Sequence, residues 1–418
     1  MSAITADSSL FRRDAQVIGL VGVAHGTSHF FHLLLAPLFP WIKEAFGLSY
    51  AELGFLMTVF FMVSGIGQFL AGFLVDRHGA LRVLFGGMAL LGLSALGLAA
   101  SQNYLMLLFF AGVSGLGNSI FHPSDFTILN RRVTQPRLAH AFSWHGVAGS
   151  IGWAAAPPVL VGLATLYSWH VALMFGALLA FVVLALLVFY RDRLDTRELD
   201  AALVKANKNQ VAGSGLDFMK LPAVWMCFAF FAFTAMALGV IQSFTPAALK
   251  ASYGTALAMG TACVTAYMLA NAAGTLAGGF LAARSTQHDR VIAGALGAAA
   301  LIAATIATGM IPTALLILFF ALMGFGSGLA GPSRDLLVRA AAPKNATGRV
   351  YGVVYSGLDA GLAIAPPIFG AAMDGGHPLW LFSMMSVFFI AALVAAMNVG
   401  AKTDSAARQL AQRSKPAH

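Results

Sequence analysis

The stretch GLGNSIFHPSD, residues 115–125, returns in a degraded form as GFGSGLAGPSR, residues 324–334, at an offset of 209 residues. A second pair, GWAAAPPV at 152–159 and GLAIAPPI at 361–368, keeps the same offset. Two segments in one register predict a chain built from a duplicated unit. The landmarks common to the first pair are Gly115, Gly117, Pro123 and Ser124, matched by Gly324, Gly326, Pro332 and Ser333.

The amino-acid composition indicates whether the chain folds in water or in a membrane. Hydrophobic residues make up 59% of the chain and charged residues 10%, whereas about a quarter of an ordinary soluble domain is charged. Apolar runs recur that are long enough to cross roughly 30 Å of hydrocarbon as helices. A membrane barrel would show alternating hydrophobicity instead. The sequence therefore predicts an all-α integral membrane protein.

The apolar runs predict twelve transmembrane helices, six on either side of a charged linker. We expect an N-terminal tail at 1–15, a first six-helix bundle at 16–190, the linker at 191–219, a second bundle at 220–400 and a C-terminal tail at 401–418. The N-terminus lacks a signal-peptide cleavage pattern, so the first run is expected to remain as a helix. The predicted spans are 16–42, 51–75, 82–100, 104–130, 138–164, 168–190, 220–247, 256–283, 290–310, 313–339, 347–373 and 378–400.

The basic residues predict the orientation. Apart from Lys43, Lys250 and Arg334, every lysine and arginine lies in, or within three residues of, the N-terminal tail, an even-numbered loop, the linker or the C-terminal tail. The positive-inside rule then places both termini and the linker in the cytoplasm, in a multi-pass protein of the plasma membrane, which in bacteria is the inner membrane. This distribution explains the net charge of +9 without a nucleic-acid partner.

The loop after the second span carries the segment GFLVDRHGALR, residues 72–82. An aspartate at a helix end beside arginines can form a charge-assisted latch that breaks and re-forms during transport. The alternative is a solvated turn whose glycine ends a helix. The candidate gating residues here are Asp76, Arg77, Gly79 and Arg82.

This loop resembles the D-R-x-G motif of the major facilitator superfamily, and GFLAAR at 279–284 resembles an eroded second copy. The resemblance covers about residues 14–400. Within the superfamily the chain is most similar to the fosmidomycin-resistance group of efflux carriers, through Ala24–His25, Pro40 and the G-x-G-x-S-x-F-H-P run at 115–123. The resemblance implies two pseudo-symmetric six-helix bundles, alternating access and export of a small molecule in exchange for protons.

Three histidines lie on one face of the first predicted helix. His25, His29 and His32 are spaced i, i+4 and i+7, within roughly 60° of one another at 100° per residue. A histidine inside a membrane is costly unless it meets water or a partner, and its intrinsic pKa makes it a plausible proton carrier. We take His29 and His32 as proton-coupling candidates and His25 as a cavity candidate. The alternatives are histidines that pin helices together, or a metal site.

The fourth predicted helix adds Asn118, His122 and Asp125 at the same spacing. Pro123 follows the histidine and removes a backbone donor, so we expect a bend there. Asn118 and His122 are cavity candidates. Asp125 lies toward the cytoplasm and is interpreted as a gate residue, with a proton site or an interfacial cap as alternatives.

The fifth predicted helix brings His145 as a further cavity candidate, beside a glycine–proline run that includes Gly149 and Gly152. Glycines at every third position permit close helix contact. This run loosely resembles the antiporter motif of the superfamily, and a tight seam between helices without a role in transport is the alternative.

The second half has fewer ionisable groups. Asp359 lies near the middle of the eleventh predicted span and is a third proton-coupling candidate, with a permanent histidine partner as the alternative. Arg334 can bind an anion bidentately or instead point to the interface. The remaining candidates are Asp335 for gating and Tyr267, Asn271 and Gln242 as neutral cavity contacts or ordinary interhelical hydrogen bonds.

These patterns favour a proton-coupled secondary transporter that exports a small polar or anionic organic molecule and works as a monomer. Proton symport of an organic acid and a histidine-ligated metal permease are the alternatives. Because Walker-type, HExxH and GxSxG motifs are absent from the sequence, we expect neither an ATP motor nor an enzyme, and no cofactor beyond a proton gradient. The two cysteines, Cys227 and Cys263, lie inside apolar runs and predict no thiolate metal site.

Overall fold

The computed structural model describes residues 2–196, 217–285, 287–341 and 347–413, and all regular structure in these ranges is helical. Twelve helices or helix pairs in them are long and apolar enough to cross a membrane, as the sequence predicts. The contacts divide the chain into two units, Met1–Ala212 and Gly213–His418, here called the first and second halves.

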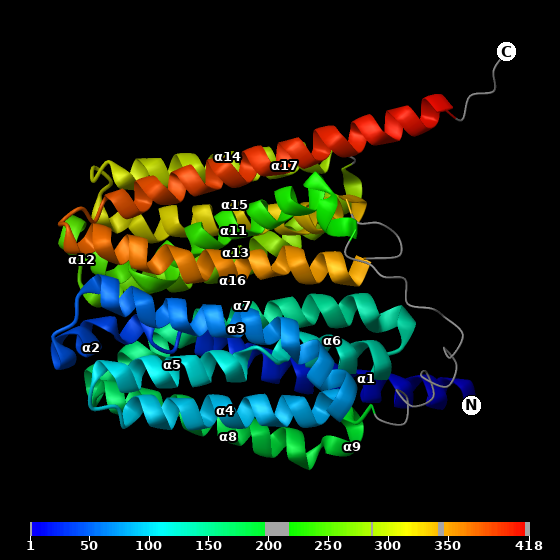
Figure 1. Ribbon diagram of the computed structural model, residues 1–418, viewed down its shortest axis with the longest axis horizontal. Coiled ribbons are helices and arrows are strands. Elements are labelled where there is room, and N and C mark those ends of the chain that lie inside the picture. The colour runs from blue at the N-terminus through cyan, green and yellow to red at the C-terminus, as the bar shows by residue number, and fades with distance from the viewer. Residues whose placement is uncertain (1, 197–216, 286, 342–346, 414–418) are drawn as a thin grey trace. The chain divides into compact units, whose positions relative to one another are not determined.

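In the first half, α1 packs against α7, α3 against α5, and α4 against both α5 and α8 (Figure 1). Helices distant in sequence are therefore neighbours in space. Its elements are α1 (Ser2–His32), η1 (Ala36–Leu38), α2 (Phe39–Phe46), α3 (Tyr50–His78), α4 (Ala80–Ala99), α5 (Tyr104–Asn118), α6 (Phe121–Arg132), α7 (Gln135–Leu166), α8 (Trp169–Phe189) and α9 (Arg191–Leu194).

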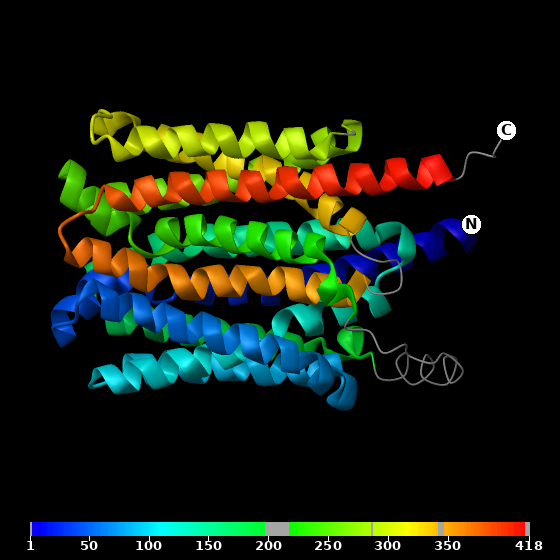
Figure 2. The ribbon, with the colours of Figure 1, turned by 45° about the horizontal axis from the view of Figure 1, so that its top comes forward.

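The second half repeats this arrangement, with α11 against α16, α13 against α15 and α14 against α17. Figure 2 shows α14 and α17 side by side. The elements are η2 (Asp217–Lys220), α11 (Pro222–Ser243), α12 (Thr245–Tyr253), α13 (Leu257–Arg284), α14 (His288–Ala307), η3 (Thr313–Leu315), α15 (Leu316–Ala341), α16 (Thr347–Asp374) and α17 (Trp380–Arg413).

The repeated glycines mark equivalent helix seams in the two halves. A Cβ atom added to Gly115 in α5 would lie 2.2 Å from the backbone oxygen of Phe60 in α3. A Cβ atom added to Gly324 in α15 would lie 2.2 Å from the backbone oxygen of Tyr267 in α13. No side chain fits at either position, so the sequence repeat preserves close backbone contact between two helices.

The second repeated pair marks another seam. A Cβ atom on Gly152 in α7 would lie 2.0 Å from the oxygen of Gly26 in α1, and one on Gly361 in α16 would lie 2.3 Å from the oxygen of Ala232 in α11. The glycine of each GxxxxPP segment therefore joins the first and fifth membrane helices of its half. In both halves this glycine allows the backbones of the two helices to touch.

The fourth predicted span is two helices. α5 ends at Asn118 and α6 begins at Phe121, so the break precedes Pro123 rather than falling on it. Proline has no N–H to donate to the backbone oxygen four residues earlier, and its ring would clash with that oxygen. It is tolerated in the first turn of a helix, where such a bond is missing anyway. The break therefore lets α6 begin a new helix with His122 and Asp125 in its first turns.

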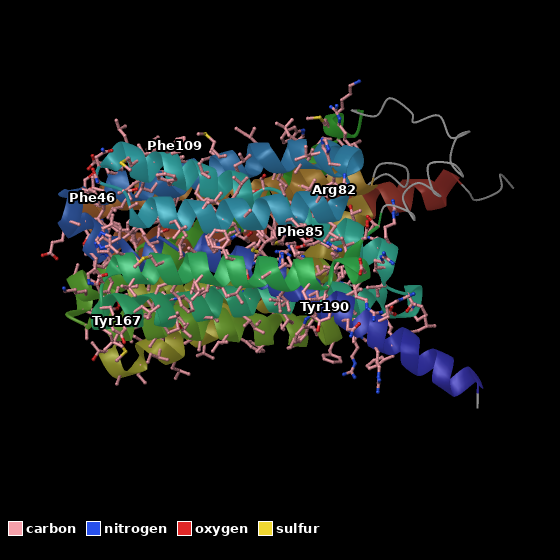
Figure 3. All side chains as sticks on the ribbon, turned by 90° about the horizontal axis from the view of Figure 1, so that it is seen from below. Phe46, Arg82, Phe85, Phe109, Tyr167 and Tyr190 are labelled. Atoms are coloured by element: carbon pink, nitrogen blue, oxygen red, sulfur yellow. The ribbon has the colours of Figure 1, made fainter. Side chains whose placement is uncertain are left out.

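One end of the first half is tied by a buried carboxylate. Asp14 in α1 is fully buried and accepts hydrogen bonds from the hydroxyl group of Thr134 at 2.5 Å and from Arg137 at 3.2 Å. These contacts hold α1 to the start of α7. Figure 3 shows Arg82 and Tyr190 toward the end where α1 begins, and Phe46 and Tyr167 toward the opposite end.

Candidate functional site

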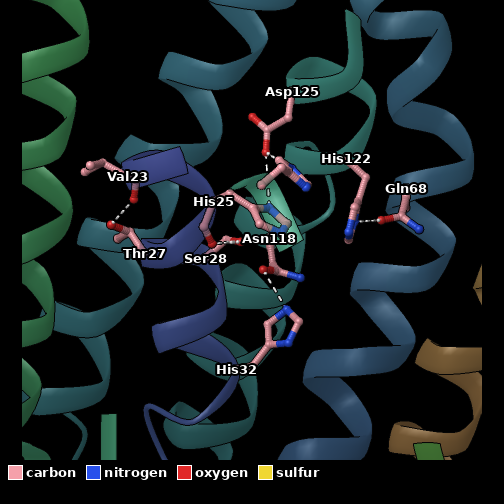
Figure 4. A network of polar contacts seen from close by, with 10 residues as sticks. Val23, His25, Thr27, Ser28, His32, Gln68, Asn118, His122 and Asp125 are labelled. Atoms are coloured by element: carbon pink, nitrogen blue, oxygen red, sulfur yellow. Dashed lines mark hydrogen bonds and ion pairs between the residues drawn. The ribbon is translucent and has the colours of Figure 1, made fainter. Parts of the chain in front are cut away.

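Six titratable side chains of the first half lie in one buried group, which we call the histidine–aspartate cluster. Sequence analysis singled out all six, and the structure brings them together from three helices. Figure 4 shows His25, His32, His122 and Asp125 among the helix backbones, with hydrogen bonds and ion pairs as dashed lines. The cluster consists of His25, His29 and His32 from α1, His122 and Asp125 from α6, and His145 from α7.

Asp125 is the only acidic member of this cluster, and its side chain is 0% exposed. Its Oδ2 atom lies 3.1 Å from Nε2 of His145, in hydrogen-bond geometry, and 3.2 Å from Nδ1 of His25, outside that geometry. Its Oδ1 atom has no hydrogen-bond partner among the described residues. A carboxylate removed from water and left half unsatisfied costs free energy unless it is protonated or paired with a cation.

The imidazole rings form a continuous ladder. The ring centroids of His145 and His25 are 3.4 Å apart, those of His25 and His29 are 4.3 Å apart, and those of His29 and His32 are 4.8 Å apart. The i, i+4, i+7 spacing on α1 produces the last two steps, as predicted from the sequence. The step to His145 depends on the close approach of α7 to α1, which spacing alone does not reveal.

Gly149 makes room for this ladder. A Cβ atom added there would lie 2.7 Å from Nδ1 of His29 and 3.2 Å from Nε2 of His25. The glycine therefore faces the rings directly, whereas Gly152, one turn further along α7, faces the backbone of α1.

His32 has a partner at both ring nitrogens. Its Nε2 atom lies 3.1 Å from Oδ1 of Asn118, and its Nδ1 atom accepts a hydrogen bond from the indole N–H of Trp153 at 3.4 Å. Asn118 in turn donates to the hydroxyl oxygen of Ser64 at 2.9 Å. This chain joins α7, α1, α5 and α3.

His122 is held from α3. Its Nδ1 atom lies 2.9 Å from Oε1 of Gln68 (Figure 4). With Oε1 as the acceptor, Nδ1 is the donor, and Nε2 of the neutral ring keeps its lone pair. Its ring centroid lies 5.3 Å from that of His25.

The cluster includes two sets of side chains with the composition of a metal site. The ligand atoms of His25, His29 and His122 lie within 4.8 Å of one another, as do those of His25, Asp125 and His145. In the second set, the rings of His25 and His145 are stacked with an interplanar angle of 22°. Of these two rings, only that of His145 has hydrogen-bond geometry with Asp125. The site can therefore share a proton between a carboxylate and an imidazole, and its composition also suits a metal ion.

Two polar residues of α3 and one of α7 join the site without having been predicted from the sequence: Ser64, Gln68 and Trp153. Ser64 and Gln68 lie four residues apart in the otherwise apolar stretch 59–75 of α3, a spacing that places them on one helix face. That spacing was the available signal. Trp153 lies inside the repeated GxxxxPP segment, where no property of the sequence marks an indole N–H as a donor.

The candidates of the second half come from α11, α13, α15 and α16. Asp359 in α16 is partly exposed and makes no side-chain hydrogen bond or ion pair with the described residues. The Arg334 guanidinium lies 4.4 Å from the ring centroid of Phe231. Asn271 donates to the backbone oxygen of Gly324 at 3.4 Å, which is an ordinary bond across the seam of α13 and α15.

Two further candidates there are buried. Tyr267 is enclosed in the same seam, and the side-chain nitrogen and oxygen of Gln242 lack hydrogen-bond partners in the described part of the chain. The side chain of Asp335 lies outside the described residues, so its predicted gating role stays a prediction.

The loop motif has the backbone that its glycine predicts. α3 ends at His78, and Gly79 follows with φ of 84°, where its N–H donates to the backbone oxygen of Val75. Only glycine adopts such a φ angle readily. The side chain of Asp76 lies outside the described residues, so the latch with Arg77 and Arg82 stays a prediction.

Solved structures show the same fold. A bacterial homolog to the human lysosomal transporter Spinster, in an inward-facing and occupied conformation, superposes with a TM-score of 0.71 at 13% identity, covering 96% of this chain and 99% of that one. The unoccupied inward-facing form gives a TM-score of 0.68 at 15% identity, covering 97% and 99%.

Curated relatives match over shorter lengths. The fosmidomycin resistance protein of Escherichia coli (strain K12) is 27% identical over 44% of this chain and 46% of its own. The MFS-type transporter YvkA of Bacillus subtilis (strain 168) is 26% identical over 38% and 37%. The 4-hydroxybenzoate transporter PcaK of Pseudomonas aeruginosa is 31% identical over 36% and 34%. The matches thus span a third to a half of these relatives.

The family comparison covers almost the whole chain. The model of the Major Facilitator Superfamily matches residues 21–262 and again residues 227–417. Two overlapping matches are what a duplicated six-helix unit produces. Together with the twelve apolar helices and the shared fold, they show that this multi-pass membrane protein belongs to the Major Facilitator Superfamily.

Proposed function

We propose that this chain is a proton-coupled secondary transporter that exports a small polar or anionic organic molecule across the plasma membrane, with both termini in the cytoplasm. The observation that carries the proposal is the buried contact of Asp125 with His25 and His145. The fosmidomycin resistance protein among its relatives supports efflux as the direction.

The charge on these three side chains explains how they would couple to protons. With both imidazoles neutral, an ionised Asp125 leaves one unbalanced negative charge in the interior, which costs several kcal/mol in order of magnitude. One proton, on the carboxylate or on either ring, makes the three groups neutral together. Release of that proton then requires water or a substrate to reach the site, which is the condition that coupling needs.

The titratable groups facing Asp125 come from every helix that contributes to the cluster. His25 reaches it from α1 and His145 from α7, and His122 lies three residues before it on α6. Among the described residues, no lysine or arginine forms an ion pair with Asp125. We therefore assign proton binding to Asp125 with its two histidines, and keep the gate role of Asp125 as a consequence of the same charge change.

Asp359 is the proposed second proton site, in the second half. It lies within an apolar span of α16, and no lysine, arginine or histidine of the described residues forms an ion pair with it. A carboxyl group without a fixed partner at membrane depth is typical of groups that load and release protons.

Proton symport of an organic acid is the second candidate. A second proton on the His25, Asp125 and His145 group gives a net positive charge, which attracts a carboxylate. A relative named as a 4-hydroxybenzoate transporter favours this class of substrate.

Purified protein in proteoliposomes with an imposed pH gradient tests both. Internal pH is recorded while phosphonates, carboxylates and cationic drugs are added in turn. We expect one class to drive a proton flux opposite in direction to its own movement, and flux in the same direction would select symport. The absence of flux with all three classes and with divalent metals, from protein that is folded, would contradict the proposal.

A further inference from the structure

His32 differs from the other members of the histidine–aspartate cluster, because both of its nitrogens are engaged outside the cluster. We propose that Trp153 is a positioning residue that holds His32 in a single neutral tautomer and so ends the chain of proton-exchanging histidines at His29. This inference rests on the proposed proton coupling, and it makes His32 a structural end point rather than a carrier.

The tautomer follows from what each group can donate. An indole N–H only donates, so the Nδ1 atom of His32 must present a lone pair to Trp153. A neutral ring then carries its proton on Nε2 and donates it to Oδ1 of Asn118. The same argument fixes the amide of Asn118, whose nitrogen is left to donate to Ser64.

Protonation of His32 would oppose these contacts. A proton on Nδ1 would point at the indole N–H, and two donors would face each other 3.4 Å apart. Trp153 cannot turn aside freely, because its ring also packs on His29 with centroids 4.3 Å apart. No such hydrogen bond fixes the neighbouring groups. The atoms Nδ1 of His29, Nδ1 of His25 and Oδ1 of Asp125 have no hydrogen-bond partner among the described residues.

The surroundings of His32 support its place at the end of the ladder. The titratable groups that face it are His29 from its own helix and His122 from α6. From α3 it meets the rings of Phe60 and Phe61. A small cavity beside it is lined mainly by apolar side chains. The cavity-lining residues are Phe31, Leu34, Leu35, Met57, Phe60, Leu98 and Ser114.

The hydrogen bond from Trp153 that keeps His32 neutral, here called the lock, limits where protons can go. Protons that exchange among Asp125, His25 and His29 would cross the first half without substrate if His32 accepted them and passed them on. A neutral His32 prevents this leak. Trp153 therefore contributes to coupling without touching the substrate.

The first test uses the imidazole nitrogens as reporters. Protein labelled with ¹⁵N-histidine is placed in lipid nanodiscs, and the signals of His32 are assigned by their loss in His32→Gln. We expect the wild-type signals to be those of the neutral Nε2–H tautomer from about pH 8 down to about pH 5. An ordinary histidine becomes charged within this range, at about pH 6.5. A wild-type His32 in the Nδ1–H form, or charged within this range, would overturn the proposal.

Trp153→Phe removes the indole donor and retains an aromatic ring beside His29. We expect the ratio of charged to neutral His32 at a given pH to rise about tenfold, which corresponds to about 1.4 kcal/mol, the size of one hydrogen bond. Trp144→Phe is the matched control, because Trp144 lies on the same helix, is 47% exposed and is outside the cluster. An unchanged ratio in Trp153→Phe would also overturn the proposal.

The second test measures proton leak and needs no substrate. Proteoliposomes receive a potassium diffusion potential, and the entry of protons is recorded with an internal pH dye. Trp153→Phe is expected to leak several-fold faster than wild type and Trp144→Phe, and equal rates would contradict the lock. If instead the lock is observed but no substrate drives proton flux in the wild-type protein, the proposed function fails and the assignment of Trp153 as a positioning residue stands.

Discussion

The missing side chain of Gly149 lets His25 and His29 approach α7. Gly149→Ala places a Cβ atom 2.7 Å from the His29 ring, closer than real contacts allow. We expect substrate-driven proton flux to fall about tenfold or more, because displaced rings cost at least about 1.4 kcal/mol of the productive arrangement. Gly162→Ala on the same helix, where an added Cβ meets nothing within 4 Å, is expected to transport normally. Equal flux in both variants would mean that ring placement does not matter.

Asp359 gives a prediction for the second half. Asp359→Asn keeps the shape of the side chain but cannot bind a proton, so we expect coupled transport to be abolished while membrane insertion is retained. Asp374→Asn, exposed at the end of the same helix, is the control. Flux is measured in proteoliposomes, and normal coupling in Asp359→Asn would remove this residue from the mechanism.

The sequence predicted the shared helix face of three histidines but not the partners of Asp125. Helical spacing correctly placed His25, His29 and His32 on one face, because that spacing is a local property of α1. Spacing did not indicate that the carboxylate of Asp125 lies beside His25 and His145, and its gate role stays a prediction. The difference arises because the contact depends on how α6 and α7 pack against α1, which is set by glycine seams and the break before Pro123.

The seams between helices determine the stability of each half. In α15, a Cβ atom on Gly328 would lie 2.0 Å from the backbone oxygen of Asn271 in α13. Gly328→Ala should therefore force the two helices apart and destabilise the protein by about 1–3 kcal/mol. Gly331→Ala is the matched control, since the nearest atom, Oγ1 of Thr275, lies 3.9 Å from the added Cβ. Thermal unfolding in detergent measures the difference, and identical midpoints would show that the seam tolerates a methyl group.

The seams also explain why some elements were predictable. Gly115 and Gly324 recur in sequence because each meets a backbone oxygen of the facing helix, so the repeat carries structural information. The break between α5 and α6 was predicted at Pro123 and occurs before it. The sequence shows where the proline is. The helix breaks earlier, because proline has no N–H to donate to the carbonyl group of the residue four positions before it.

For the protein as a whole, duplication and twelve spans followed from composition and repeats, because membrane length and hydropathy leave few alternatives. The orientation is a prediction that labelling can test. Both native cysteines are buried, so introduced cysteines report without background. We expect Lys43→Cys and Lys250→Cys to react with a membrane-impermeant maleimide on intact cells, and Arg290→Cys to react only after permeabilisation. The reverse pattern would invert the topology.

The central claim is that protons are coupled to substrate through Asp125. The most direct measurement compares substrate-driven proton flux in proteoliposomes containing wild-type protein, Asp125→Asn, or Asp192→Asn as an exposed control. The account predicts that Asp125→Asn inserts and folds but loses the proton flux, while Asp192→Asn behaves as wild type. Undiminished proton flux through Asp125→Asn would contradict it.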